Sequence, residues 1–180
     1  MPVDVKGVVA GAFMEMAARK DVDKITVKDL VEACGISRQT FYYHFRDIVD
    51  VLEWTARQGV DRLLTQSLKA DSPREALGLF VDFAVESQPM VRRLLNSQRR
   101  DVMERIMVET VRAYLERSVR EWGLEPPLNP ADWQVTLDFY AYGMAGLLLG
   151  GDCRSGQDRK RLTDQLSRLL SGEMVHPQRD

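Results

Sequence analysis

The 180-residue sequence has few of the residues from which disulfide, metal and membrane structures are built. It contains two cysteines, Cys34 and Cys153, and two histidines, His44 and His176, too few ligands for a disulfide framework or a zinc cluster. The uncharged apolar run from 139 to 151 is too short to cross a bilayer. The N-terminus lacks the pattern of a secretory signal. These absences predict a cytoplasmic protein without a metal, a cofactor or a membrane partner.

The overall charge does not point to a particular partner, and the motif inventory argues against an enzyme. The 25 basic residues are balanced by 27 acidic ones, so the overall charge gives no sign of a nucleic-acid partner. The glycine-containing segment 143–151 has no lysine and follows no strand pattern, unlike a phosphate-binding loop. Cys34 and His44 have the residue types of a nucleophile and its base, but Cys34 is expected on the inner face of a short helix. We therefore predict that the protein is not an enzyme.

Apolar residues recur at helical spacing along almost the whole chain. Prolines and capping residues divide this pattern into segments. Predicted helices begin near Asp4, Thr26, Ser37, Asp47, Pro73, Pro89, Arg99, Pro130 and Ser155. The longest of them is expected from about Arg99 to Trp122. The predicted fold class is all-α, with about nine helices: an N-terminal three-helix helix-turn-helix domain and a C-terminal helical bundle.

The segment 25–45, ITVKDLVEACGISRQTFYYHF, has the organisation of a helix-turn-helix motif. Its first helix is expected to end at Gly35, because glycine tolerates the positive φ of a tight turn. Ser37 is the expected cap of the second helix. Phe41 and Phe45 lie four residues apart on that helix and are expected to face inward. The remaining side chains stay outside, so this helix is predicted to enter the major groove of DNA.

The side chains of the second helix suit contacts to DNA. Arg38 can donate two hydrogen bonds to guanine, Gln39 can pair with adenine, and Thr40 offers a hydroxyl and a methyl group. Other polar side chains can reach phosphate oxygens, which fix the register. The predicted DNA-binding set is Thr26, Lys28, Ser37, Arg38, Gln39, Thr40, Tyr42, Tyr43, His44 and Arg46. The alternative is an aromatic packing helix in which Tyr42 and Tyr43 are half-buried.

In order and spacing, this segment is similar to the DNA-binding domain of the TetR family of bacterial transcription regulators, over about residues 5–55. The variant VEACGISRQTFYYHFRD, followed by Trp54, resembles the branch that includes dihydroxyacetone-kinase regulators, and 139–146 is similar to the penultimate helix of that branch. The resemblance implies nine helices, a homodimer built mainly on the last two, and an effector cavity in the C-terminal body. The chain departs from the family at Ile48, where many members place a phosphate-binding lysine that Arg46 would replace.

Two roles are predicted for the helices beyond residue 48. Methionine and aromatic side chains suit an adaptable effector cavity. This set is Phe80, Phe83, Met103, Met107, Tyr114, Phe139, Tyr140 and Met144. Small and leucine side chains suit a dimer interface across a two-fold axis. That set is Ala141, Ala145, Leu148, Leu162, Leu166 and Leu169. Ordinary packing within one chain remains the alternative for both sets.

Four arginines have no evident partner at helical spacing, and they are candidates for contact with an acidic effector or partner. They are Arg92, Arg93, Arg99 and Arg100. The other arginines of this region have acidic residues four positions away, as on a solvated helix face.

Together these features predict a sequence-specific DNA-binding transcriptional regulator that is a one-component sensor. Residues 1–47 would form the DNA-binding domain, residues 48–172 would bind an effector or co-regulator and dimerise, and residues 173–180 would be a mobile tail. The expected partners are double-stranded DNA with a palindromic operator, a second copy of the chain, and an unknown small-molecule or protein effector. The alternative function is a TetR-like helical protein-interaction module that acts as an activator through a protein co-regulator rather than a small ligand.

Overall fold

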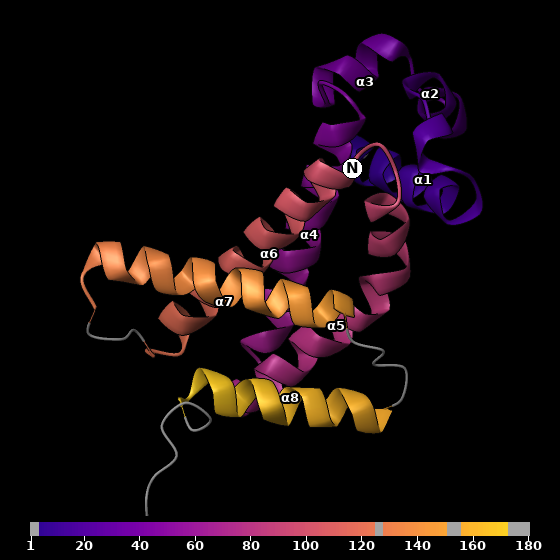
Figure 1. The fold of residues 1–180 in the computed structure, drawn as a ribbon. Helices are drawn as coiled ribbons and strands as arrows, with labels where there is room; N and C mark the ends of the chain where they lie inside the picture. The colour runs from indigo at the N-terminus through magenta and orange to yellow at the C-terminus, as the bar shows by residue number, and fades with distance from the viewer. Residues whose placement is uncertain (1–3, 125–127, 151–155, 173–180) are drawn as a thin grey trace, which may run out of the picture. The chain divides into compact units, whose positions relative to one another are not determined.

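The computed structural model describes residues 4–124, 128–150 and 156–172, which form eight α-helices and one 3-10 helix (Figure 1). In chain order they are α1 (Val5–Arg19), the 3-10 helix η1 (Val22–Lys24), α2 (Val27–Cys34), α3 (Arg38–His44), α4 (Ile48–Ser67), α5 (Pro73–Leu95), α6 (Arg100–Glu121), α7 (Pro130–Gly150) and α8 (Gly156–Leu170). These described ranges contain no strand, so the predicted all-α class is confirmed. The predicted cap at Ser155 and the predicted mobile tail 173–180 lie outside the described residues.

The helix count is close to the nine expected, and the difference arises at Pro89. The sequence predicts a break there, but the structure places Pro89 inside α5. An interior proline removes one backbone hydrogen bond and costs about 3 kcal/mol in a helix. Helix α5 nevertheless continues, because Val85 and Leu94 are both buried on either side of the proline. The longest helix is therefore α5, with 23 residues, rather than α6, with 22.

The chain divides into two compact units, each built from two segments of sequence. The first unit consists of Met1–Gly59 and Pro89–Thr110, and the second of Val60–Gln88 and Val111–Asp180. The boundaries between the units fall within α4, α5 and α6. These units describe how the chain packs, and the functional division at residue 47 that the sequence suggests stays a prediction.

The core of the first unit joins α1, α2 and α3 to parts of α4, α5 and α6. Its largest fully buried side chains include Phe13, Leu30, Phe41 and Phe45. The inward orientation predicted for the last two is confirmed, and burial of one such side chain contributes about 1.5–3 kcal/mol. Leucine and methionine side chains from the segment 89–110 complete the same cluster. The helix-turn-helix is thus built on residues that are distant in the sequence.

Two arginines of the segment 89–110 fasten the first unit through hydrogen bonds. Arg93 Nη1 donates to the carbonyl oxygens of Ala17 (3.0 Å) and Ala18 (2.6 Å), near the end of α1. Arg99 Nη1 donates to the carbonyl oxygen of Val22 and to Asp23 Oδ1, both at 3.0 Å. The last carbonyl oxygens of a helix have no donor within the helix, so an arginine side chain can donate hydrogen bonds to them. The prediction that these two arginines meet an external acidic partner is therefore not supported by the structure.

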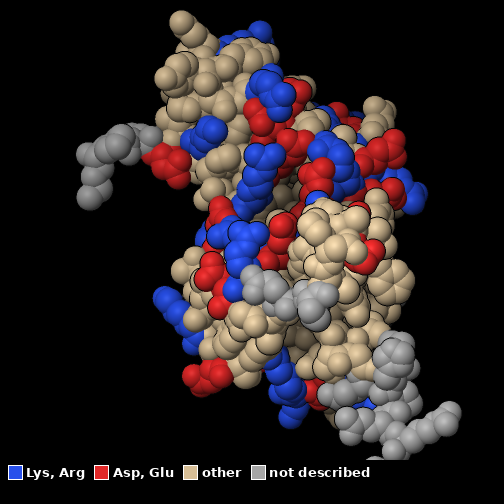
Figure 2. Space-filling model, turned by 90° about the vertical axis from the view of Figure 1, so that its left-hand side faces the viewer, with Lys and Arg blue, Asp and Glu red and all other residues tan. Residues whose placement is uncertain are grey.

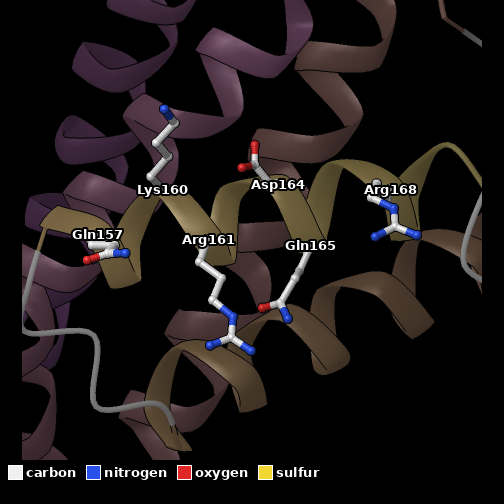
Figure 3. Close-up of a pocket in the computed structure, with 6 residues that line it drawn as sticks. All are labelled: Gln157, Lys160, Arg161, Asp164, Gln165 and Arg168. Atoms are coloured by element: carbon white, nitrogen blue, oxygen red, sulfur yellow. The ribbon is translucent and has the colours of Figure 1, made fainter.

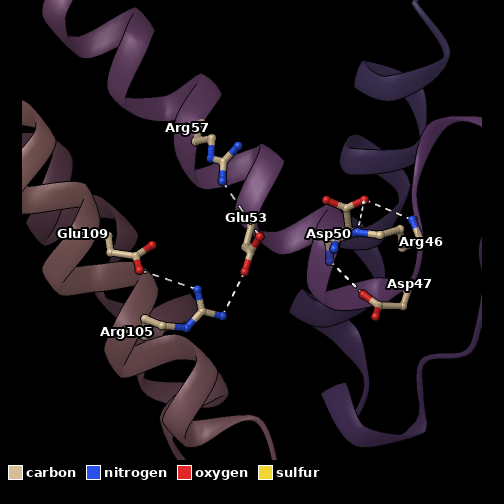
Figure 4. A network of polar contacts seen from close by, with 7 residues as sticks. All are labelled: Arg46, Asp47, Asp50, Glu53, Arg57, Arg105 and Glu109. Carbon is tan, nitrogen blue, oxygen red and sulfur yellow. Dashed lines mark hydrogen bonds and ion pairs between the residues drawn. The ribbon is translucent and has the colours of Figure 1, made fainter.

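A third arginine of this segment joins α6 to α4 within the first unit (Figure 4). Arg105 donates to Glu53 Oε1 at 2.9 Å and also lies 3.6 Å from Glu109. Glu53 is 16% exposed, and its second oxygen lies 4.0 Å from Arg57. Glu53 therefore lies between two arginines, and its ion pair with Arg105 joins α4 to α6.

In the second unit, α4, α5 and α6 meet at a buried aromatic pair. The rings of Phe80 and Tyr114 are stacked with centroids 4.6 Å apart. The Tyr114 hydroxyl donates to the carbonyl oxygen of Ala76 at 2.9 Å and shares a hydrogen bond of 3.0 Å with Ser67 Oγ. Burial raises the pKa of Tyr114, so this hydroxyl stays protonated. The buried hydroxyls of Tyr114 and Ser67 therefore both have hydrogen-bond partners inside the unit.

Candidate nucleic-acid interface

The turn between α2 and α3 is built by short-range hydrogen bonds. Thr26 and Asp29 form a capping box: Thr26 Oγ1 accepts from the Asp29 amide at 3.2 Å, and Asp29 Oδ2 accepts from the Thr26 amide at 2.8 Å. Helix α2 ends at Gly35, whose φ of 64° is left-handed and suits glycine. Ser37 Oγ then accepts from the Thr40 amide at 3.0 Å and caps α3. The helix start at Thr26, the turn at Gly35 and the cap at Ser37 were predicted from the sequence.

The capping box also sets the charge at the start of α2. The hydrogen bond from the Thr26 amide is the main reason that the pKa of Asp29 lies below its usual value, with the Thr26 hydroxyl and Lys20 adding to it. Lys20 Nζ lies 3.2 Å from Asp29 Oδ2. Because the carboxylate is already engaged by these donors, it completes the cap and stays ionised at neutral pH.

Helix α3 presents its polar side to the surroundings while its apolar side is anchored in the core. Arg38, Gln39, Tyr42 and Tyr43 are exposed, and Tyr43 is 86% exposed. The rings of Phe41 and Phe45, 0% and 2% exposed, lie on the inner side. The alternative of a half-buried aromatic packing helix is therefore not supported. The exposed side chains are hydrogen-bond donors and acceptors of the types that contact bases and phosphates.

The rest of the predicted DNA-binding residues are also accessible, but several already have a partner. Thr40 is partly buried, and its hydroxyl lies 2.9 Å from Ser37 Oγ. Lys28 pairs loosely with Glu32 at 3.8 Å. Exposed pairs of this kind are worth about 0–1 kcal/mol, so a phosphate can replace the carboxylate at little cost. Thr26 and Ser37 are exposed, and His44 is partly buried.

Arg46 lies just beyond α3, next to the start of α4 (Figure 4). Its amide donates to Asp50 Oδ2 at 3.0 Å, and its Nε lies 3.6 Å from the same atom. The amide is the main reason that the pKa of Asp50 is lowered. The Asp50 amide in turn donates to Asp47 Oδ1 at 2.9 Å, which confirms Asp47 as a cap of α4. Ile48 is 8% exposed and belongs to the core.

One basic residue near α3 was missed by the sequence reasoning. Lys6, in the first turn of α1, places its Nζ 5.3 Å from the centre of the Phe45 ring. The sequence carries no local signal for this contact, because the two residues are 39 positions apart. It arises only once α1 packs in the same core as α3.

The surroundings of Cys34 do not suit a catalytic nucleophile. Its Sγ lies 3.8 Å from the carbonyl oxygen of Val8, and burial raises the pKa of the thiol. A thiol with a raised pKa is a poor nucleophile at neutral pH. No group of three or more potential metal ligands occurs among residues 4–124, 128–150 and 156–172.

The structure does not bring all the predicted effector-cavity residues together. Met103 and Met107 belong to the core of the first unit, whereas the other six lie in the second. Phe139 is 71% exposed. Phe80, Tyr114 and Met144 are buried, whereas Phe83 and Tyr140 are partly buried. Only six of the eight residues predicted for the effector cavity therefore lie in the second unit, and one of these six, Phe139, is exposed.

The predicted dimer residues are also divided. Ala141, Ala145 and Leu166 are buried within the single chain, which is the packing alternative, and Leu148, Leu162 and Leu169 are partly buried. The exposed side of α7 is instead lined by other apolar side chains. Val135, Phe139 and Tyr142 are 67–71% exposed and are spaced by four and three residues, on one helical stripe. We call these three residues the α7 stripe.

The α8 surface contains a hollow of about 460 Å³. It is lined by Gln157, Lys160, Arg161, Asp164, Gln165 and Arg168. All six belong to one helix, and Figure 3 shows Lys160 and Asp164 pointing away from Arg161 and Gln165. The lining is polar and open, so it differs from the apolar cavity that was predicted.

Surface charge by itself does not mark the interface. On the face in Figure 2, basic and acidic side chains are interspersed and no single basic field stands out. This agrees with the near balance of 25 basic and 27 acidic residues. A DNA contact must therefore depend on individual side chains such as those of α3.

Comparison with known proteins supports the assignment of the N-terminal segment. Residues 11–53 match the family model of bacterial regulatory proteins, tetR family. No curated protein sequence matched the chain significantly. No helix in the described part of the chain is long and apolar enough to cross a membrane.

Solved structures of transcription regulators share the fold over nearly the whole chain. The dihydroxyacetone kinase operon activator DhaS is similar with a TM-score of 0.65 and 16% identity, over 93% of this chain and 94% of that one. The TetR family repressor AlkX from Dietzia sp. strain DQ12-45-1b is similar with a TM-score of 0.58 and 17% identity, over 93% of this chain and 96% of that one. A putative TetR-family regulator from Syntrophomonas wolfei is similar with a TM-score of 0.59 and 11% identity, over 92% of this chain and 94% of that one.

These proteins are described as regulators of transcription and not as enzymes. At such low identities the likeness shows the fold, while the family model identifies the segment that contains the helix-turn-helix. Residues 11–53 therefore match the TetR family of bacterial regulatory proteins, and the chain shares its fold with solved structures of transcription regulators.

Proposed function

We propose that the protein is a sequence-specific transcription regulator in which α3 enters the major groove of an operator. The observation that carries this proposal is the two-sidedness of α3: Gln39 and Tyr43 are exposed, while Phe41 and Phe45 are buried. In this arrangement Arg38, Gln39 and Thr40 read bases, because they lie in the first turn of the recognition helix. Tyr42, Tyr43, His44 and Arg46 contact phosphates, with Thr26 and Lys28 from the preceding helix.

The regulator works as a homodimer in this proposal. One short helix reads too few base pairs to select an operator, whereas two helices related by a two-fold axis read symmetric half-sites. The α7 stripe supports this, because an apolar surface of a soluble protein is commonly a protein contact. The partly buried Leu148, Leu162 and Leu169 would lie at the edge of the same contact.

The second unit is the proposed site for an effector. Trp122 Nε1, near the end of α6, is buried and has no hydrogen-bond partner in the described residues. A buried donor without an acceptor costs about 1–3 kcal/mol, so an effector that carries an acceptor would recover this energy. A protein co-regulator that binds the second unit is the alternative. Mass spectrometry of the purified protein separates them: a co-purifying small molecule supports the effector, and a co-purifying polypeptide supports the co-regulator.

Selection of bound duplexes from random DNA tests the main proposal. The purified protein, at stated salt concentration, should enrich a palindromic sequence whose half-sites lie about one helical turn apart. A pool without an enriched sequence after repeated rounds would contradict the proposal. The Gln39→Ala variant serves as the matched comparison, since it should lose selectivity at one position of each half-site and retain the rest.

A further inference from the structure

The basic side chains of residues 4–59 differ in whether a carboxylate already engages them. Lys20, Lys28, Arg46 and Arg57 each lie within 4.0 Å of an acidic oxygen. Within the described residues, the side chains without an ion pair are Lys6, Arg19, Lys24 and Arg38. An unpaired cation keeps its full charge for a phosphate, because no bond to a carboxylate must first be broken.

Of these four cations, Lys6 and Arg38 lie next to α3. Arg38 is on the helix itself, and Lys6 lies against Phe45, the C-cap of α3. Arg19 ends α1, thirteen residues after Lys6, which corresponds to about 20 Å along the helix. Lys24 lies in η1, beyond the end of α1. Lys6 is therefore the additional cation at the end of α3 where the proposed phosphate contacts His44 and Arg46 are found.

The contact with Phe45 gives Lys6 a defined position. A cation over an aromatic ring is attracted by the ring, and the lysine stem can cover apolar surface while its ammonium stays in water. Lys6 is partly buried and the Phe45 ring is 2% exposed, as expected for such an arrangement. A side chain that is already ordered loses less conformational entropy when it binds.

The nearby carboxylate does not cancel the charge of Lys6. Asp50 accepts from the Arg46 amide at 3.0 Å and lies 3.6 Å from Arg46 Nε, so Arg46 is its main partner. Lys6 is close enough to contribute slightly to the lowered pKa of Asp50, but it makes no ion pair with it in the described residues. Two cations thus surround one carboxylate at this end of α3.

We propose that the Lys6 ammonium binds a backbone phosphate of duplex DNA beside the C-terminal end of α3. This inference rests on the proposed function, since it requires α3 to face DNA. It adds a contact from α1 to those of α2 and α3. A phosphate contact carries no base preference, so Lys6 contributes to affinity and register on every sequence alike.

The Lys6→Met variant tests the inference, because methionine keeps an unbranched stem on Phe45 and removes the charge. Binding is measured on a 30-base-pair duplex of random sequence and on the selected operator, over a range of salt concentrations. Loss of one phosphate contact should reduce the slope of log K against log salt by about 0.9 for each bound subunit. The affinity should fall by the same factor on both duplexes, and Lys6→Arg should retain the wild-type slope.

Arg19→Met is the matched control, because it removes an exposed, unpaired basic charge from the other end of α1, about 20 Å along the helix from Lys6. Its slope should equal that of the wild type. A Lys6→Met slope equal to that of Arg19→Met overturns the inference, as does a loss confined to the operator. If Lys6→Met does not fold, Lys6→Gln is judged by the same criteria. The proposed function fails separately, when the wild type enriches no sequence; if the wild type binds neither duplex, both fail.

Discussion

Helices α3 and α7 both expose aromatic side chains, but the residues around them differ. On α3, the exposed Tyr42 and Tyr43 stand among Arg38 and Gln39, so the surface is rich in hydrogen-bonding groups. On α7, the exposed Phe139 stands in a stripe of apolar side chains. The first surface suits a polar partner whose groups need hydrogen bonds, and the second suits an apolar partner that excludes water. We therefore expect the two units of the chain to meet different kinds of partner.

The largest expected effect comes from a charge in the α7 stripe. Phe139→Arg would bury an unpaired cation in the proposed dimer contact, at a cost of about 3–5 kcal/mol, which is more than 100-fold in dimer affinity. The variant should elute as a monomer and lose selective binding to the operator, as measured by analytical ultracentrifugation and DNA titration. Leu68→Arg is the control, because Leu68 is an exposed leucine outside α7. A Phe139→Arg protein that remains dimeric would show that α7 does not form the contact.

The next effect sharpens the role of α3. Arg38→Ala should cost about 1–3 kcal/mol on the selected operator and relax the preference at one base position. Arg19→Ala removes another exposed, unpaired arginine of the same unit and should leave operator binding unchanged. Titrations on operator and random duplexes measure both. An equal loss on random DNA would identify Arg38 as a phosphate contact and not a base contact.

An effect of similar size, on stability and not on DNA binding, tests the packing of the second unit. Tyr114→Phe removes the hydroxyl that bonds to Ser67 and Ala76. The free energy of unfolding should fall by about 1–3 kcal/mol, because these buried groups lose their partner. Urea denaturation measures this, with Tyr43→Phe as the exposed control. Unchanged stability would show that the fold does not need the Tyr114 hydroxyl.

The smallest effect concerns the cap that starts α2. Thr26→Ala removes the hydroxyl that accepts from the Asp29 amide and donates to Asp29 Oδ2, and it should cost about 1 kcal/mol. The pKa of Asp29 is lowered in the folded state, partly by this hydroxyl. The stability that the hydroxyl gains from the ionised carboxylate is therefore fully present above the ordinary carboxyl pKa. It is lost as the pH falls through the folded pKa. The stability difference between wild type and variant should therefore narrow below about pH 3.8, and a difference that widens in acid would contradict the capping role.

The sequence was sufficient for the features that depend on neighbours in the chain. Thr26, Gly35 and Ser37 act on groups within about four residues, so the caps and the turn follow from local chemistry. The two faces of α3 follow from helical spacing alone. The all-α class needed no more than the periodicity of apolar residues.

The features that the sequence did not reveal depend on contacts between distant segments. Pro89 remains helical because buried residues on both sides outweigh one lost hydrogen bond. Lys6 meets Phe45, and Arg93 and Arg99 meet backbone near α1 and η1, only after those segments have packed. The exposed side of α7 likewise depends on how the neighbouring helices pack. No local sequence pattern predicts that Ala141 is buried while Phe139 is exposed.

The bonds of Arg93, Arg99 and Arg105 to the N-terminal elements have a consequence for protein engineering. A fragment that stops at residue 59 would leave the carbonyl oxygens of Ala17 and Ala18 without their donor and remove Leu94 from the apolar core. Chimeras that exchange the N-terminal helices between regulators should therefore carry over residues 89–110 from the same parent. Grafts that divide these two stretches between parents are expected to yield poorly folded hybrids.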